Sequence, residues 1–284
     1  MPPQRHRSSD GVELAVHDLG GRPDGVGLLL VHATGFCGPV FRPLASVLGA
    51  RFRCWAVDLR GHGLSVTPDA VDYDWSGFAD DVLAAVDGLG GGSATARPLV
   101  ALGHSSGGAA LLLAEAERPG TFESLWCYEP IVWPQPEVAR DRAEWLAAGA
   151  GKRRHTFPSA EDAYENFRSK PPMSALAPDA LRAYVECGFE PRPDGSVTLR
   201  CRPESEAAVY RRAVEGDRFT RLAEVACPVV VAAGGRSDAI TPVRAQAQVD
   251  ALPAGRLRVF DDLGHFGPLE EPAAVAASVL VDLA

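Results

Sequence analysis

The residues of this sequence best suited to chemistry lie in the stretch PLVALGHSSGGAALLLAEAE, residues 98–117. A short apolar run ends at Gly103, Ser105 follows, and two glycines at positions 107 and 108 lead into a run rich in alanine and leucine. This order predicts a strand, a tight turn and a helix, with Ser105 at the turn. Small residues suit such a turn because strand and helix approach closely around an exposed side chain. The predicted chemistry is nucleophilic attack by Ser105 Oγ.

A serine hydroxyl needs a base to remove its proton and an acid to hold that base in the correct tautomer. We look for both after predicted strands, because functional groups in open α/β sheets converge at the carboxyl ends of the strands. His265 lies a few residues after a strand predicted at residues 256–260, and Asp238 follows the apolar run at residues 228–232. We therefore expect Ser105, Asp238 and His265 to be the catalytic residues.

Alternating strands and helices surround these residues. Apolar runs and apolar–polar alternation predict strands, and apolar residues at helical spacing predict the helices between them. The strands are expected at residues 12–17, 26–31, 53–57, 99–102, 122–128, 228–232 and 256–260, and helices at residues 41–48, 78–89, 242–252 and 272–283 and after Gly108. This alternation predicts an α/β fold with a doubly wound, mostly parallel sheet of about eight strands.

The alternation stops between residues 131 and 220. Proline-rich connections there separate helical pieces at residues 141–148 and 160–168, and the segment FEPRPDGSVTLRCR predicts a hairpin with turn residues at Pro193, Asp194 and Gly195. A block of this length is too long for a loop of a compact domain. We therefore predict a core domain of residues 1–130 and 221–284, and an inserted subdomain of residues 131–220.

Composition narrows the classes of partner. The chain has 284 residues, 46% of them hydrophobic, and a formal net charge of −9, which argues against nucleic acid and anionic membranes as partners. No apolar run reaches the roughly 20 residues of a membrane span, and the first 16 residues lack the apolar region of a secretory signal, so we expect a cytoplasmic protein. Six scattered cysteines predict reduced thiols, and seven dispersed histidines predict no metal site; no cofactor is expected.

Five motifs together give a resemblance to the α/β-hydrolase superfamily. They are HATGF, DLRGHGLS, GHSSGG, GGRSDAITP and LGHFGPLEEP, which begin at residues 32, 58, 103, 234 and 263. The resemblance covers nearly the whole chain outside residues 131–220, and it implies that this inserted block is a helical lid. It also implies that backbone N–H groups of Ser106 and of the loop after residue 31 form an oxyanion hole. The loop departs from the usual His-Gly-X pattern; Thr34 matches position X best, with Phe36 and Ala33 as alternatives.

Two charged groups of residues need an interpretation. Some members of the superfamily place the catalytic acid after the sixth strand, where this chain has Glu129; we favour Asp238 and interpret Glu129 as a carboxylate that anchors the lid. The lid also contains five cations, which we interpret as a solvated face, with binding of an anionic substrate group as the alternative. These cations are Lys152, Arg153, Arg154, Arg200 and Arg202.

Three further histidines and one pair of charges lie in the motifs. We expect His32, His62 and His104 to fix the shape of loops and not to transfer protons. Asp58 and Arg60 are predicted to form a charge pair that holds their loop.

The predicted function is that of a cofactor-independent serine hydrolase that cleaves an ester or a lactone through an acyl-enzyme on Ser105. Phe36, beside the oxyanion loop, and Trp133 and Trp145, in the insertion, predict apolar walls for a small-molecule substrate with an apolar acyl part. Carbon–carbon bond hydrolysis, perhydrolysis and acyl transfer use the same triad and stay open as alternatives. So does a ligand-sensing receptor built on the same fold, and the sequence is compatible with a homo-oligomer.

Overall fold

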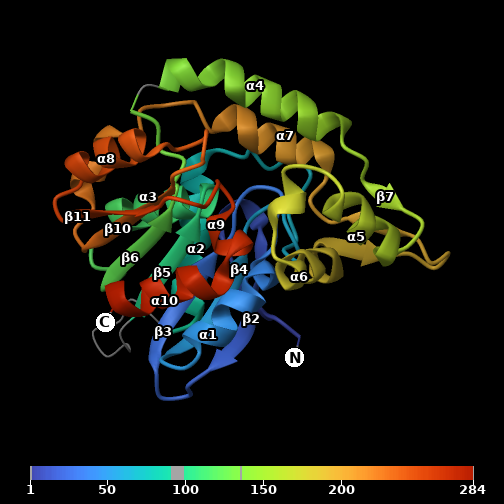
Figure 1. Cartoon of the computed structure of the whole chain (residues 1–284), viewed down its shortest axis with the longest axis horizontal. Helices are drawn as coiled ribbons and strands as arrows, with labels where there is room; N and C mark the ends of the chain where they lie inside the picture. The colour runs from blue at the N-terminus through green and yellow to red at the C-terminus, as the bar shows by residue number, and fades with distance from the viewer. Residues whose placement is uncertain (1, 91–98, 135, 284) are drawn as a thin grey trace.

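The computed structural model describes residues 2–90, 99–134 and 136–283. Its centre is one eight-stranded sheet in the order β1-β2-β4-β3-β5-β6-β10-β11 (Figure 1). The strands β1, β2 and β4 pair antiparallel, and the remaining neighbours are parallel. The prediction of a mostly parallel α/β sheet is confirmed. The strands are β1 (Gln4–Arg7), β2 (Glu13–Gly21), β3 (Val26–Val31), β4 (Phe52–Asp58), β5 (Leu99–His104), β6 (Ser124–Tyr128), β10 (Val229–Gly234) and β11 (Gly255–Phe260).

Helices cover both faces of this sheet, which explains why its central strands are apolar without interruption. In β3, Leu29 and Val31 belong to one core together with residues of α2, α3 and α8, whereas Leu28 and Leu30 belong to the opposite core with residues of α1 and α10. These helices are α1 (Arg42–Leu48), α2 (Trp75–Gly88), α3 (Ser106–Glu117), α8 (Pro242–Ala251) and α10 (Pro272–Asp282). Within the described ranges, no helix is both long and apolar enough to cross a membrane.

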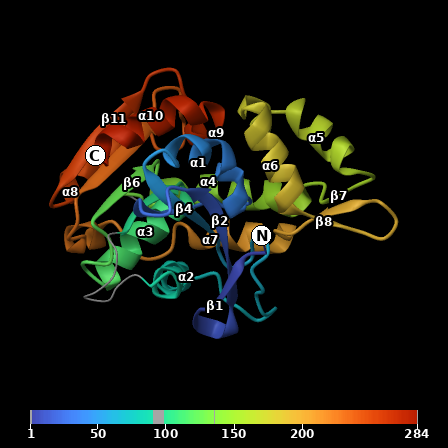
Figure 2. The same ribbon diagram turned by 90° about the horizontal axis from the view of Figure 1, so that it is seen from below.

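The chain leaves the large sheet after β6 and returns to it at β10, and these two strands are neighbours. Between them lie α4 (Pro136–Lys152), β7 (Thr156–Phe157), α5 (Ala160–Arg168), α6 (Pro178–Gly188), β8 (Phe189–Pro191), β9 (Val197–Leu199) and α7 (Pro203–Arg212). The predicted hairpin is present as β8 and β9, and with β7 they form a second, antiparallel sheet. Helix α4 lies along α7, and α5, α6 and β8 gather at the end of the molecule opposite α8 and β11 (Figure 2).

Candidate active site

Ser105 lies at the turn between β5 and α3, with φ 56° and ψ −115°. Glycines make this turn sterically possible. A Cβ atom on Gly103 would lie 2.6 Å from the Gly108 Cα, and one on Gly107 would lie 2.2 Å from the Val31 carbonyl oxygen. The helix thus packs directly on the strand, and Ser105 is held in a backbone conformation that non-glycine residues rarely adopt.

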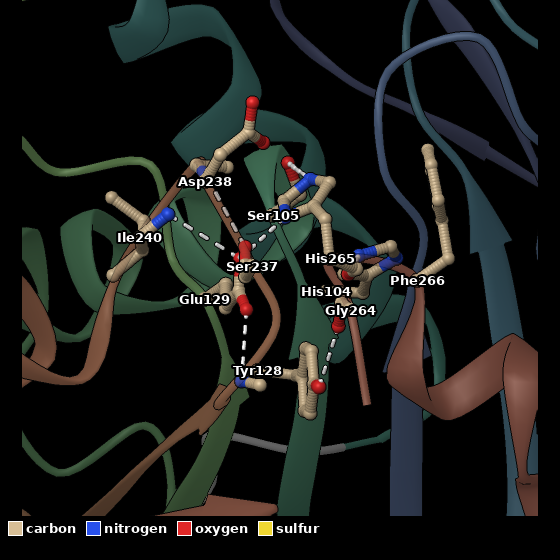
Figure 3. Close-up of polar contacts among 12 residues, drawn as sticks. His104, Ser105, Tyr128, Glu129, Ser237, Asp238, Ile240, Gly264, His265 and Phe266 are labelled. Carbon is tan, nitrogen blue, oxygen red and sulfur yellow. Dashed lines mark hydrogen bonds and ion pairs between the residues drawn. The ribbon is translucent and has the colours of Figure 1, made fainter. Parts of the chain in front are cut away.

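His265 lies beyond β11, and its ring connects the serine to a carboxylate (Figure 3). Its Nε2 atom is 3.2 Å from Ser105 Oγ, and its Nδ1 atom donates to Glu129 Oε2 over 2.6 Å. His104 Nε2 donates to the backbone oxygen of His265 over 2.8 Å, which holds the loop from the other side. The imidazole can therefore accept the proton of Ser105 while a carboxylate fixes its tautomer.

The Glu129 side chain is fully buried at the end of β6, where the backbone has φ 45°. The loop after β10 surrounds the carboxylate with donors. Gly234 N–H donates to Oε1 over 2.9 Å, and the Ser237 hydroxyl and Ile240 N–H donate to Oε2 over 2.7 and 3.3 Å. Together with His265, these donors bind both oxygens of the buried carboxylate. Burial of the same anion without such partners would cost on the order of several kcal/mol.

Asp238, the acid expected from the sequence, does not lie on His265 in this structure. Its side chain is 83% exposed and forms two hydrogen bonds of 3.0 and 3.1 Å with Arg142 of α4, and the Arg142 guanidinium lowers the pKa of Asp238. Figure 3 shows the carboxylate directed away from the Nδ1 atom of His265. The prediction that Asp238 is the acid bound to His265 is therefore wrong. The loop after β10 is folded so that the Ser237 hydroxyl binds Glu129, and Glu129 already accepts the hydrogen bond from His265 Nδ1.

The loop after β3 offers few backbone N–H groups to a substrate. Gly35 N–H donates to His62 Nε2 over 2.9 Å, and Phe36 N–H donates to the Ala33 oxygen over 3.1 Å. Within the described residues no acceptor binds the Thr34 N–H. Gly35 has φ +82°, a conformation that favours glycine. Of the alternatives for this loop, the Phe36 N–H is therefore already engaged, whereas within the described residues neither the Thr34 N–H nor the Ala33 N–H has an acceptor.

Ser106 is the first residue of α3, so its N–H has no acceptor within the helix. Thr34, Ser105 and Ser106 line the same cavity. The loop and the helix N-terminus can thus present two N–H groups beside the serine.

The histidines of the loops fix backbone geometry, as expected. His32 donates from Nδ1 to the Ala33 oxygen over 2.8 Å and accepts the Leu59 N–H at Nε2 over 3.1 Å. His62 donates from Nδ1 to the Arg60 oxygen over 2.8 Å. Burial lowers the pKa of His32 to about 3 and that of His62 to about 4, so each ring stays neutral and serves as one donor and one acceptor.

These buried rings predict that the protein loses stability in mild acid. Burial also lowers the pKa of His104 well below its ordinary value. The unfolded chain protonates all three histidines near pH 6.5, whereas the folded chain does not, so unfolding takes up protons below that pH. We expect the free energy of unfolding to fall from pH 6.5 to pH 5 by up to about 4 kcal/mol per pH unit, about 1.4 for each histidine. Urea denaturation at several pH values measures this slope. His155→Gln, at an exposed position, should leave it unchanged, and a flat profile would refute the expectation.

Asp58 and Arg60 do not pair with each other, contrary to the sequence-based expectation. The buried Arg60 guanidinium binds the buried Asp81 carboxylate and also Asp10. Asp58 accepts a 2.8 Å hydrogen bond from His17 and two backbone N–H bonds. Both residues hold this loop, but through partners elsewhere in the chain.

A cavity of about 1010 Å³ opens over Ser105 and His265, between the core loops and the inserted segment. Phe36 and Trp133, the residues expected to contact substrate, line it, as does Trp145, whose side chain is exposed. Most of the wall is apolar. Among the described residues, no three His, Cys, Asp or Glu side chains are grouped so as to hold a metal ion.

One of the five cations of the insertion is not part of a solvated face. Arg153 lines the cavity, where it binds Glu206 and the Tyr184 hydroxyl. Lys152, Arg154 and Arg202 are exposed, and Arg200 is half-buried outside this cavity. The interpretation of these cations as a surface feature is wrong for Arg153.

Comparison with known proteins places this geometry in a family. Residues 28–278 match the family model described as "Alpha/beta hydrolase family". The chain belongs to the alpha/beta hydrolase family. It is the family that the sequence motifs resemble, and among the relatives are proteins named as a hydrolase and as an esterase.

Several curated relatives match most of this hydrolase. It is 30% identical over 239 residues to 2-(acetamidomethylene)succinate hydrolase of Mesorhizobium japonicum, which covers 83% of this chain and 81% of the relative. It is 28% identical over 260 residues to pimeloyl-[acyl-carrier protein] methyl ester esterase of Chromobacterium violaceum, covering 89% and 91%. The crystal structure of E-2-(acetamidomethylene)succinate hydrolase has the same fold, with a TM-score of 0.83, 23% identity and 98% coverage of both chains.

Proposed function

We propose that this hydrolase cleaves a carboxylic ester or a lactone through an acyl-enzyme on Ser105. The observation that carries the proposal is the chain of hydrogen bonds from Ser105 Oγ through His265 to Glu129, at 3.2 and 2.6 Å. Ser105, at one end of this series of hydrogen bonds, lies in a largely apolar cavity. Such a cavity suits a small-molecule substrate with an apolar acyl part. Residues 131–220, which form one wall of that cavity, act as its lid in this proposal.

The reaction proceeds in two halves. Ser105 Oγ attacks the carbonyl carbon and passes its proton to His265 Nε2, while the N–H groups of Thr34 and Ser106 bind the oxyanion. The carbon–oxygen bond to the leaving alcohol breaks, and His265 gives that oxygen its proton. A water molecule then loses a proton to His265 and attacks the acyl group, and the free acid leaves as Ser105 recovers its proton. Glu129 fixes the tautomer of His265 and stabilises the imidazolium in both halves.

The relatives support cleavage of an ester. The relative from Chromobacterium violaceum is named as a methyl ester esterase, and it matches this chain along 89% of its length. Position 105 is a serine and not an aspartate or a glutamate, so the proposed nucleophile is a hydroxyl.

Trapping of the acyl-enzyme tests this proposal. A fluorophosphonate should label Ser105 alone, as peptide mass spectrometry can establish, and the labelled protein should lose activity on 4-nitrophenyl acetate. A burst of about one nitrophenolate per protein molecule is expected if deacylation limits the rate. A panel of alkyl esters, lactones and β-diketones then identifies the bond. Turnover of the diketones alone, or labelling at another residue, would overturn the proposal.

A further inference from the structure

Arg153 is a cation placed inside the catalytic cavity by the end of α4. Its ion-pair partner, Glu206 of α7, is more deeply covered: 20% of the Arg153 side chain is exposed, against 7% for Glu206. The more accessible member of the pair is thus the positive one. Both side chains line the cavity, so a substrate inside it can reach the cation.

The Arg153 guanidinium has hydrogen-bonding capacity to spare. Of its five N–H donors, one is used by Glu206 and one by the Tyr184 hydroxyl, which lies 2.9 Å away. Within the described residues, no other acceptor binds the Arg153 guanidinium. Burial opposes the charge, but Tyr184 and Glu206 raise the pKa of Arg153, so it stays a cation. Glu206 and Tyr184 hold the plane of the guanidinium in place and leave donors for a ligand.

This ion pair lies against the loop that carries Thr34. A Cβ atom on Gly35 would lie 2.7 Å from Glu206 Oε1 and 3.5 Å from Arg153 Nη1. On another side, the guanidinium lies 5.8 Å from the centre of the Phe167 ring. A ligand group bound to Arg153 would therefore lie near the loop whose Thr34 N–H we assign to the oxyanion.

The other cations of the cavity differ in their partners. Arg142 is paired with Asp238, and Arg236 with Asp262. Lys170 donates to the Asn166 amide over 2.7 Å, and in the part of the chain described here it has no carboxylate partner. The four cations and three carboxylates that line the cavity leave its wall with one net positive charge.

We propose that Arg153 selects substrates that carry a carboxylate remote from the bond that is cleaved. The carboxylate forms charge-assisted hydrogen bonds with the guanidinium, and the apolar wall contacts the carbon chain between the two groups. This inference rests on the proposed function and narrows it to a class of substrate, esters that carry a carboxylate beyond an apolar spacer, on either the acyl or the alcohol side.

Matched pairs of esters test the selection. One pair carries the charge on the acyl side, mono-4-nitrophenyl adipate against 4-nitrophenyl hexanoate, and the other on the leaving group, 4-acetoxybenzoate against its methyl ester. In one pair, kcat/KM is expected to favour the anion by about 10- to 100-fold, the range for a hydrogen bond to a charged group. Arg153→Met should abolish this ratio, and Arg153→Lys should retain part of it.

Controls separate selection from folding. Arg154→Met changes the adjacent exposed arginine, which lies outside the cavity, and should keep the wild-type ratio. Arg153→Met with Glu206→Gln removes the whole ion pair, so no unpaired carboxylate is left, and it should show the same lost ratio as Arg153→Met. The ratio within one preparation is unaffected by the fraction of folded protein.

Several outcomes would overturn the inference. They are the absence of an anion preference in both pairs, a preference for the neutral esters, and a preference that survives in Arg153→Met. Calorimetry of adipate binding to Ser105→Ala tests the site without turnover, and binding should be lost when Arg153→Met is added. Adipate binding without hydrolysis of any ester would refute the proposed function alone, whereas hydrolysis of neutral esters without binding or preference would refute only the role of Arg153.

Discussion

Ser105→Ala should lower kcat for 4-nitrophenyl hexanoate by at least about 10⁴-fold, because loss of the nucleophile removes the acyl-enzyme route altogether. The alanine side chain fits the turn without new contacts, so the far-ultraviolet circular dichroism spectrum and the Tm should stay close to those of the wild type. Single-turnover kinetics with excess enzyme measure the loss without interference from deacylation. Residual hydrolysis then reports what the N–H groups and the cavity contribute by themselves.

Ser106→Ala is the matched control for this variant. It removes the adjacent hydroxyl but keeps the backbone N–H that we assign to the oxyanion, so it should lose less than about tenfold in kcat. If Ser105→Ala kept substantial activity while Ser106→Ala lost it, the assignment of the nucleophile would be wrong.

Glu129→Gln should lower kcat by about 10³- to 10⁴-fold, the size of effect seen when a triad acid is replaced by its amide. The amide nitrogen cannot accept the bonds that His265 Nδ1, Ser237 and Ile240 now donate to Oε2, and the imidazolium loses its counter-charge. Glu129→Gln should therefore change kcat more than it changes KM. Steady-state kinetics together with the Tm separate loss of chemistry from loss of stability.

Asp238→Asn provides the contrasting result, because its side chain is 83% exposed and binds Arg142. We expect a change of less than about threefold in kcat, in line with the small contribution of exposed ion pairs. A large loss in Asp238→Asn combined with a small loss in Glu129→Gln would reverse the two roles, and would restore the acid that the sequence motif favours.

The fold could be predicted because local pattern and burial agree over most of the sheet. The apolar run at β3 is uninterrupted because helices cover both faces, and its predicted bounds match the structure. Strand β1 was not predicted. Its residues, QRHR, are mostly exposed at the sheet edge, so no apolar periodicity marks them.

The choice of acid could not be made from sequence because two carboxylates follow adjacent strands, β6 and β10. Which one reaches His265 depends on the positive φ of Glu129 and on the path of the loop that brings Ser237 to it. The one available signal was position: Glu129 directly follows its strand, whereas Asp238 lies four residues past the end of β10.

The predictions for Arg60 and Arg153 were wrong because their partners come from distant parts of the sequence. Arg60 binds Asp81, 21 residues away on α2, and nothing in DLRGHGLS indicates this partner. Arg153 belongs to a row of three cations at the end of α4, and only the arrangement of α7 and α6 distinguishes it from its neighbours. Local periodicity shows that a helix has a polar face but not which element that face contacts.

The ion pair between Asp238 and Arg142 and the carboxylate of Glu129 differ in how strongly salt can screen them. The carboxylate that binds His265 is sealed from solvent, whereas this ion pair joins α4 to the loop after β10 in contact with bulk water. Counter-ions screen exposed pairs far more than buried ones. Ionic strength therefore weakens this connection between the inserted segment and the core, and it leaves the buried carboxylate largely unaffected.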